Sequence, residues 1–412
     1  MEIYKYYNIN FNKTIILAHL VGLLFLSSFI VFLPQFLSLM KGEYAGLTLN
    51  GEIGYRYIRE LIVVLIYLLF LERILLSFFY TSYIVLPIVV IVSLSVVWTI
   101  FKYQNLILIV TGLRFFEYLI LMPIFVYIFK NTTRKNLFFK IVNKYIAIFL
   151  LFESVIAILE VLFVPPVLGK TIFGSRAFGT FPSPNLFGIT MAILGLYFFI
   201  CSKKKLFFLS IVLAILSGSR LAIMIGFFLI IINVVERVKP RFLYIYFWLI
   251  FPFVSFVAFK IFSSSYFSGR HIEKIYRLDV WSEAISNGIR NVIDFIIGWG
   301  VGLGSNTTTT LFGPGRFEGQ FIADSTFIFL LGSFGILGLF FYFFSIVLTY
   351  FKGVKDTKFT FVLLLVSVPI IWFENFPANL LIVIIWACYI TKYTRRIERK
   401  FYAKNLYYIS NN

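Results

Sequence analysis

Two arginines lie in short motifs of small residues that are suited to binding an anion. Arg176 lies in GSRAFGTFPSPN (174–185), and Arg220 closes the motif SGSR (217–220). A guanidinium is a permanently charged, planar fork of N–H donors that matches phosphate oxygens. Ser219 and its small neighbours add hydroxyl and backbone donors beside it. The combination predicts a site for a phosphate-like anion, and the alternative is a charge that snorkels to a membrane interface.

Further residues with possible chemistry lie between positions 270 and 325. Arg270 and Arg277 open a long polar segment, and Trp281 follows in RLDVWSEAI. Asp324 precedes Ser325, and an acid can orient or deprotonate a hydroxyl that lies within hydrogen-bond reach. The alternatives are ordinary charges on a loop helix for the arginines and a dipole-favoured acid at a helix start for Asp324.

The histidines and cysteines of the chain offer little support for a metal or cofactor site. His19 and His271 lie far apart, and Cys201 and Cys388 form no CxxC motif or Cys/His cluster. We therefore expect no metal site, no disulfide framework and no other cofactor. The glycine run GWGVGLG (298–304) would let backbone N–H groups approach a ligand closely, but it lacks the spacing and the lysine of a P-loop.

The composition indicates a membrane protein. Of 412 residues, 60% are hydrophobic and 13% are charged, whereas soluble domains carry about 25% charged residues. Apolar runs recur from end to end, each long enough to cross roughly 30 Å of hydrocarbon. The net charge of +19 falls mostly in short alternating loops, which is the positive-inside pattern. We therefore expect the lipid bilayer, and no nucleic acid, as a partner.

The sequence predicts an all-α polytopic membrane protein, with one integral domain over 1–412 and about twelve transmembrane helices. The predicted spans are 14–33, 57–71, 82–101, 105–129, 144–164, 184–201, 205–218, 220–236, 242–262, 322–349, 359–374 and 377–393. Basic residues gather at 5–13, 73, 130–140, 203–205, 237–241, 352–358 and 392–400, which places both termini in the cytoplasm. The other side carries 34–56, 165–183, the turn 217–220 and a large extracytoplasmic loop over 263–321. In that loop, Glu273–Arg290 has the apolar spacing of a short amphipathic helix on the outer face.

Both arginine motifs lie where predicted spans begin. Prolines stop any helix before span 184–201, and Ser183 or Asn185 can cap it. Positive charge at a helix start on the outer side opposes both the helix dipole and the positive-inside rule. This position favours a functional role for Arg176 and Arg220 over an ordinary interfacial charge.

The ordered set of motifs resembles the O-antigen polymerase and ligase superfamily. The matching segments are GSRAFGTFPSPN, SGSR with LAIMIGFF, RLDVWSEAI, GWGVGLG and ADSTFIFLLGSFGILGLF, within residues 170–390. The resemblance implies a metal-independent membrane glycosyltransferase of GT-C-like architecture with a polyprenyl-diphosphate-linked donor. It also implies that Arg176, Arg220 and Arg277 bind the diphosphate. Ligases of the family usually carry a His-Asn-like pair where this chain has Asp324-Ser325, which favours a polymerase.

The expected function is a polysaccharide polymerase at the outer face of the bacterial cytoplasmic membrane, acting in capsule, O-antigen or exopolysaccharide synthesis. Undecaprenyl-diphosphate-linked oligosaccharide would be donor and acceptor, with a flippase and a chain-length regulator as partner proteins. The expected catalytic residues are Asp324, Arg176, Arg220 and Arg277. The expected substrate-binding residues are Arg176, Arg220, Arg270, Arg277, Asn185, Ser219 and Trp281. Two alternatives stay open: a ligase that moves finished glycan to another acceptor, and a flippase or transporter of the lipid-linked oligosaccharide.

Overall fold

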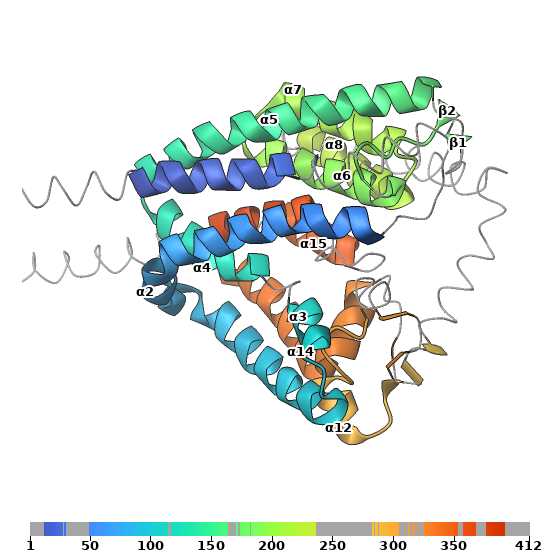
Figure 1. Ribbon diagram of the computed structural model, residues 1–412. Helices are drawn as coiled ribbons and strands as arrows, with labels where there is room; N and C mark the ends of the chain where they lie inside the picture. The colour runs from blue at the N-terminus through green and yellow to red at the C-terminus, as the bar shows by residue number, and fades with distance from the viewer. Residues whose placement is uncertain are drawn as a thin grey trace, which may run out of the picture.

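The computed structural model is built almost entirely from helices (Figure 1). It describes residues 12–27, 29, 49–113, 117–163, 170–171, 174–181, 183–235, 282–283, 285–286, 288–304, 312–313, 316–317, 320, 325–352, 357–367 and 376–391. In these ranges the exception is a pair of two-residue antiparallel strands, β1 (Lys170–Thr171) and β2 (Gly174–Ser175). The predicted all-α class is confirmed.

The helices follow one another along the chain with short connections where both sides are described. In order they are Asn12–Ser27, α2 (Leu49–Tyr103), α3 (Leu106–Leu113), α4 (Glu117–Lys130), α5 (Thr132–Phe163), α6 (Pro184–Ile200), α7 (Lys204–Leu216), α8 (Arg220–Val235), α12 (Val292–Ile297), α14 (Thr326–Lys352), α15 (Thr357–Ser367) and Phe376–Thr391. The helices α6, α7 and α8 match three consecutive predicted spans closely, so the arginine motifs lie at the helix ends where the sequence placed them.

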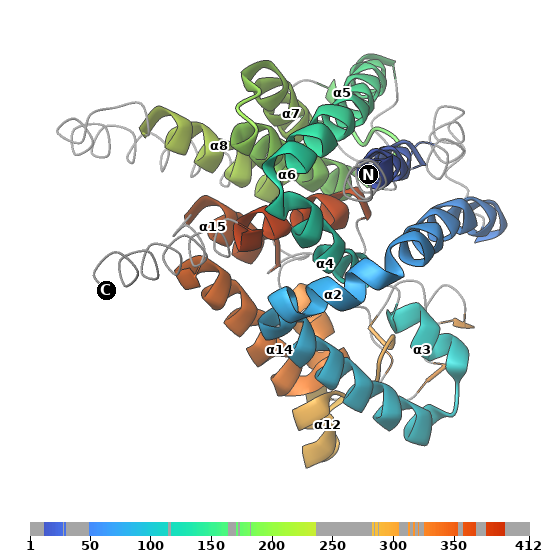
Figure 2. The ribbon, with the colours of Figure 1, turned by 90° about the vertical axis from the view of Figure 1, so that its left-hand side faces the viewer.

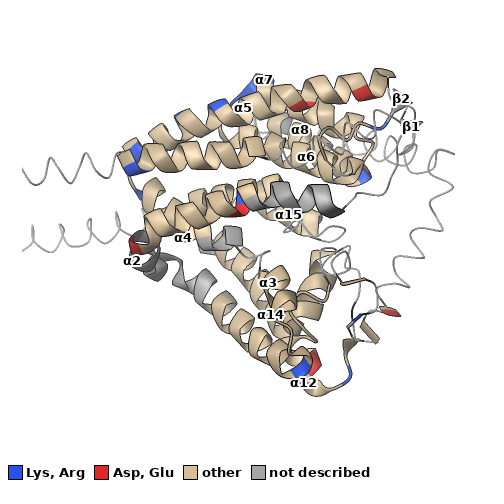
Figure 3. Ribbon diagram, in the orientation of Figure 1, with Lys and Arg blue, Asp and Glu red and all other residues tan. Residues whose placement is uncertain are grey.

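Two helices in the described part of the chain are long and apolar enough to cross a membrane. They are α5, with a mean hydropathy of 2.5, and residues Thr326–Phe351 of α14, with a mean hydropathy of 2.2. In α5 the basic residues lie in the N-terminal half and the two acids in the C-terminal half, as Figure 3 shows along the ribbon. Length and composition thus suggest association with a membrane, and the twelve-span topology stays a prediction.

The structure divides the first half of the chain differently from the prediction. The predicted spans 57–71 and 82–101 both fall within the 55-residue helix α2. Figure 1 shows that α2 runs toward one end of the molecule, changes direction and returns at an angle, so one helix holds both apolar runs. The predicted span 105–129 covers α3 and most of α4, and residues 114–116 between them lie outside the described residues. The predicted span 242–262 lies outside the described residues.

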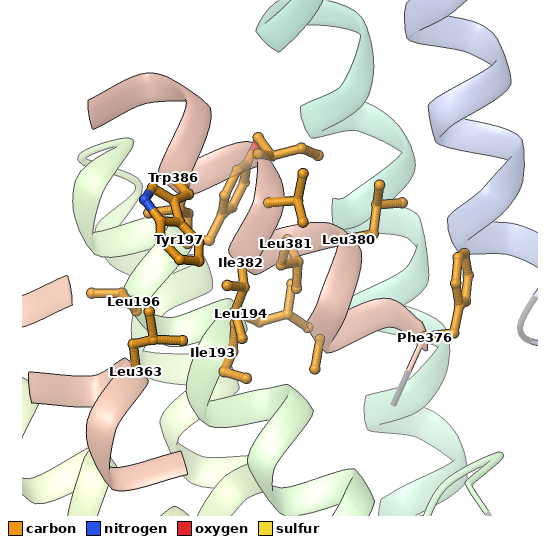
Figure 4. Close-up of a cluster of buried hydrophobic side chains, with 14 of the residues drawn as sticks. Ile193, Leu194, Leu196, Tyr197, Leu363, Phe376, Leu380, Leu381, Ile382 and Trp386 are labelled. Atoms are coloured by element: carbon orange, nitrogen blue, oxygen red, sulfur yellow. The ribbon is translucent and has the colours of Figure 1, made fainter. Parts of the chain in front are cut away.

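Helix α6 lies among the helices that carry the arginine motifs. It packs against α7 and α8 and also contacts α15, and Figure 2 shows these helices around it. On another face of α6, Ile193 and Leu194 lie against Leu381 and Ile382 of the Phe376–Thr391 helix, with Leu363 of α15 nearby (Figure 4). Close packing on several faces fixes α6, and therefore fixes its N-terminal end.

Candidate functional site

Arg176 lies on irregular backbone that is buried in the protein. Residues 176–181, between β2 and α6, are all buried, and Arg176 is 7% exposed. Helix α6 begins at Pro184 because Ser183 caps it, and the Ser183 hydroxyl accepts from the Leu186 N–H at 3.3 Å. Buried backbone outside a helix needs partners for its N–H and C=O groups. In this segment the partners come from two directions.

The first set of partners is the turn between α7 and α8. Arg176 Nε donates to the Ser217 carbonyl oxygen at 2.9 Å, and the Ala177 N–H donates to the Leu216 carbonyl oxygen at 3.1 Å. Arg176 Nη2 also donates to Asn185 Oδ1 at 3.0 Å, from the first turn of α6. The two arginine motifs therefore meet in one site, although 41 positions separate Arg176 from Ser217 in the chain.

The turn that carries Arg220 is shaped by its own serines. The Ser217 hydroxyl donates to the Ala214 carbonyl oxygen at 2.6 Å and accepts from the Ser219 N–H at 3.1 Å. Ser217 and Ser219 are buried, and Arg220 is half-buried as the first residue of α8. Ser219 thus has a structural part in the turn, and its part in substrate binding stays a prediction.

The second set of partners is a pair of acids on α5. Glu160 Oε2 accepts hydrogen bonds from the N–H groups of Phe178 and Gly179, both at 2.8 Å. Glu153 accepts from the Thr180 N–H at 3.1 Å and from the Thr180 hydroxyl. Both acids are fully buried, and their spacing of two helical turns puts them on one face of α5. They pair three consecutive N–H groups of the segment that follows Arg176.

Three buried charged residues, Glu153, Glu160 and Arg59, were assigned no role from the sequence. Glu153 and Glu160 carried a signal, because acids inside an apolar helix are costly and rare. Arg59 is 8% exposed, pairs with Glu60 at 2.7 Å and lies 5.0 Å from the centroid of the Phe376 ring. In the sequence, Arg59 could have been noticed because it forms a charged pair with Glu60 at the start of an apolar run.

Four predicted site residues lie outside the part of the chain that the structure describes, namely Arg270, Arg277, Trp281 and Asp324. Most of the predicted amphipathic helix Glu273–Arg290 lies outside it as well. Beside Asp324, the buried Ser325 hydroxyl accepts from the Phe327 N–H at 3.2 Å at the start of α14. The structure therefore brings together Arg176, Asn185 and the Ser217–Arg220 turn, and the roles of the other residues stay predictions.

The glycine run 298–304 is buried throughout. The Trp299 N–H donates to the Gly332 carbonyl oxygen of α14 at 2.8 Å. The Val301 N–H donates to the Thr99 hydroxyl of α2 at 2.9 Å. The glycines thus allow the chain to approach α2 and α14 closely, and a part in binding a ligand stays a prediction.

Two further features fix this segment. Helix α14 is interrupted at Gly335, which has φ 64°, and a Cβ at this position would lie 2.3 Å from the Ile296 carbonyl oxygen. In α12, the buried Asp294 accepts from Lys102 Nζ at 2.9 Å and from Trp98 Nε1 at 3.1 Å, both on α2. The segment is therefore a packed part of the helical body, although the sequence placed it in an outer loop.

Among the described residues, no group of three or more His, Cys, Asp or Glu side chains is placed to hold a metal ion. No family model, curated protein or solved structure matches this chain. The resemblance to the O-antigen polymerase and ligase superfamily therefore rests on the sequence motifs alone. To those motifs the geometry adds the junction of Arg176 with the Ser217–Arg220 turn.

Proposed function

We propose that the protein is an integral membrane polysaccharide polymerase. It would join polyprenyl-diphosphate-linked oligosaccharide repeat units at the outer face of the cytoplasmic membrane. The observation that carries this proposal is the single site built from the two arginine motifs. There Ser217 and Asn185 orient the buried Arg176 beside the turn that presents Arg220. Oriented guanidinium groups in surroundings of low dielectric are suited to a diphosphate.

In the proposed reaction, a hydroxyl of the acceptor's non-reducing sugar attacks the anomeric carbon of the donor. A new C–O bond forms while the bond from the anomeric carbon to the diphosphate breaks, and polyprenyl diphosphate leaves with the electron pair. Arg176, Arg220 and Arg277 stabilise the negative charge on the leaving group. Asp324 accepts the proton of the attacking hydroxyl. The donor is already activated by its diphosphate, so the scheme uses no nucleotide sugar.

The transporter alternative has one observation to consider. Transporters often bind substrates at broken helices near the middle of the membrane, and α14 is broken at Gly335. However, the Trp299 and Gly300 N–H groups pair with the Gly332 carbonyl oxygen at the break. Packing of the glycine run therefore accounts for the interruption. A ligase would use the same arginine site, and its product would distinguish it from a polymerase.

Purified protein with lipid-linked repeat units as the sole substrate tests the proposal. The wild type should form long glycan that stays on its lipid carrier and runs as a ladder on a gel. Arg176→Gln should lower the rate of polymer formation about 100-fold, because removing one donor to a developing oxyanion has an effect of about this size. Arg220→Gln should act in the same direction.

Arg134→Gln is the matched control. Arg134 lies near the start of α5 and donates to the Tyr127 hydroxyl at 3.4 Å, at the end of α5 opposite to Glu160. This variant should polymerise like the wild type. An unchanged rate of polymer formation in Arg176→Gln would refute the proposal. Short units on a different acceptor would indicate a ligase, and movement of intact lipid-linked units without product would indicate a transporter.

A further inference from the structure

Residues 176–181, which we call the arginine segment, are held from both sides. Arg176 and Ala177 bond to the turn between α7 and α8. The next three residues bond to the acids of α5, through two N–H groups on Glu160 and the N–H and hydroxyl of Thr180 on Glu153. Two hydrogen bonds to the turn and four to the acids of α5 leave the segment little freedom. The position of α5 thereby sets the position of the Arg176 backbone.

The acids are matched to one conformation of this segment. Gly179 has φ +58°, and a Cβ there would lie 2.1 Å from Glu153 Oε2, so the carboxyl group lies directly against the backbone. An apolar side chain at position 153 would remove the cost of a buried carboxyl group. It would also leave the Thr180 N–H and hydroxyl without their acceptor. Packing of α5 alone therefore does not explain why position 153 holds an acid.

The two carboxylate oxygens of the other acid, Glu160, have different surroundings. Its Oε2 accepts both the Phe178 and the Gly179 N–H, while its Oε1 is buried and accepts no hydrogen bond from the described residues. Both N–H groups point at one oxygen because the chain turns at Gly179. This converging pair of N–H groups fixes the turn that follows Arg176.

We propose that Glu153 and Glu160 are positioning residues of the arginine site, an inference that rests on the proposed function. They act through Arg176: by holding Phe178–Thr180 they set the height and orientation of its guanidinium relative to the turn that carries Arg220. The two arginines then meet the same diphosphate without reordering of the loop. Preorganisation of this kind favours binding because little conformational freedom remains to be lost.

The test combines hydrogen exchange with steady-state kinetics on the purified full-length protein. Glu153→Leu keeps a side chain of similar size but removes both acceptor oxygens, so the Thr180 amide should exchange about tenfold faster, as expected for loss of a buried hydrogen bond. Glu153→Gln should exchange like the wild type, because its amide oxygen can accept from the Thr180 N–H while its NH₂ group donates to the Thr180 hydroxyl. Ser154→Ala is the control on the same helix, since Ser154 bonds to the Leu151 carbonyl oxygen.

The kinetic readout separates positioning from simple loss of folded protein. In Glu153→Leu the KM for the lipid-linked donor should rise about tenfold, and Glu153→Gln should restore it, in line with one buried hydrogen bond. Loss of folded protein alone would lower the apparent kcat and leave KM unchanged. Thr180→Val removes the hydroxyl partner from the loop side and should raise KM in the same direction, which keeps the test open if Glu153→Leu fails to fold.

Three outcomes decide the inference. Faster exchange together with a raised KM in Glu153→Leu or Thr180→Val supports it. Unchanged exchange in both variants, or faster exchange with an unchanged KM, overturns it. A wild type that forms no polymer would instead refute the proposed function, and the exchange measurement would still show whether Glu153 holds the arginine segment.

Discussion

At Arg176 the protein uses uncharged groups to orient a guanidinium. The Ser217 carbonyl and the Asn185 amide are neutral dipoles, so these two contacts fix the plane of the charged guanidinium. In surroundings of low dielectric, that charge attracts an anion more strongly than it would at a wet surface. This agrees with the proposal that the site binds a diphosphate.

Gly179→Ala should disrupt the arginine segment. The residue has φ +58°, and an added Cβ would lie 2.1 Å from Glu153 Oε2 and 2.8 Å from Phe187 Cε2. Backbone strain alone costs about 1 kcal/mol, and the steric conflict adds to it. We expect the midpoint of thermal unfolding in detergent to fall by about 5 °C, with loss of polymer formation.

The control for this change is Gly313→Ala. Gly313 has a similar φ of +83°, but no described atom lies within 4 Å of an added Cβ. It should show the backbone cost alone. Equal effects of the two substitutions would contradict the close contact between Gly179 and Glu153.

The residues of the site differ in how far the sequence could predict them. Arg176, Arg220 and Asn185 could be found because each lies in a local motif with glycine, serine or proline neighbours. The part that Glu153 plays could not be predicted, because its partner Thr180 lies 27 positions away. A hydrogen bond between a helix and irregular backbone has no periodic pattern, so only the folded structure shows it.

Helix α12 illustrates how a short element depends on its neighbours. It has six residues, too few for a stable isolated helix, and Asn291 caps its start through the Asp294 N–H at 2.8 Å. The Lys102–Asp294 ion pair joins it to α2, with the Asp294 side chain fully buried and that of Lys102 20% exposed. Tertiary contacts therefore determine where α12 lies.

A double-mutant cycle tests this attachment. Lys102→Met should destabilise the protein more than Lys102→Met combined with Asp294→Asn, because the single change leaves a buried carboxylate without its counter-charge. We expect a coupling energy of about 1–3 kcal/mol, measured from reversible unfolding in mixed micelles. Strictly additive effects would mean that the ion pair contributes little to holding α12.

Helix positions could be predicted where strong local signals bound an apolar run. Helix α6 begins at Pro184 and α8 at Arg220, as the motifs predicted. Helix α5 begins at Thr132, well before the predicted residue 144, because basic residues lower the hydropathy without preventing a helix. The continuity of α2 could not be predicted, since two apolar runs do not reveal whether the backbone between them stays helical.

Over the whole molecule, contacts between distant segments join helix ends that the predicted alternation places on the same side. Lys102 follows span 82–101 and bonds to Asp294, which belongs to the predicted outer loop. The arginine segment bonds to the turn between α7 and α8, also predicted to be outside. Near the opposite ends, the Tyr197 hydroxyl donates to Asn143 Oδ1 at 2.7 Å. These contacts agree with the predicted alternation of sides, and the twelve-span topology stays a prediction.

Cysteine labelling in intact cells tests the orientation directly. In a background with Cys201→Ser and Cys388→Ser, we expect Gln104→Cys, in the exposed turn between α2 and α3, to react with a membrane-impermeant maleimide. Lys203→Cys, in the exposed turn between α6 and α7, should react only after permeabilisation, because basic loops stay in the cytoplasm. The reverse pattern would put the Arg176 site on the cytoplasmic side, and the proposed polymerisation at the outer face would then lack its diphosphate-binding groups.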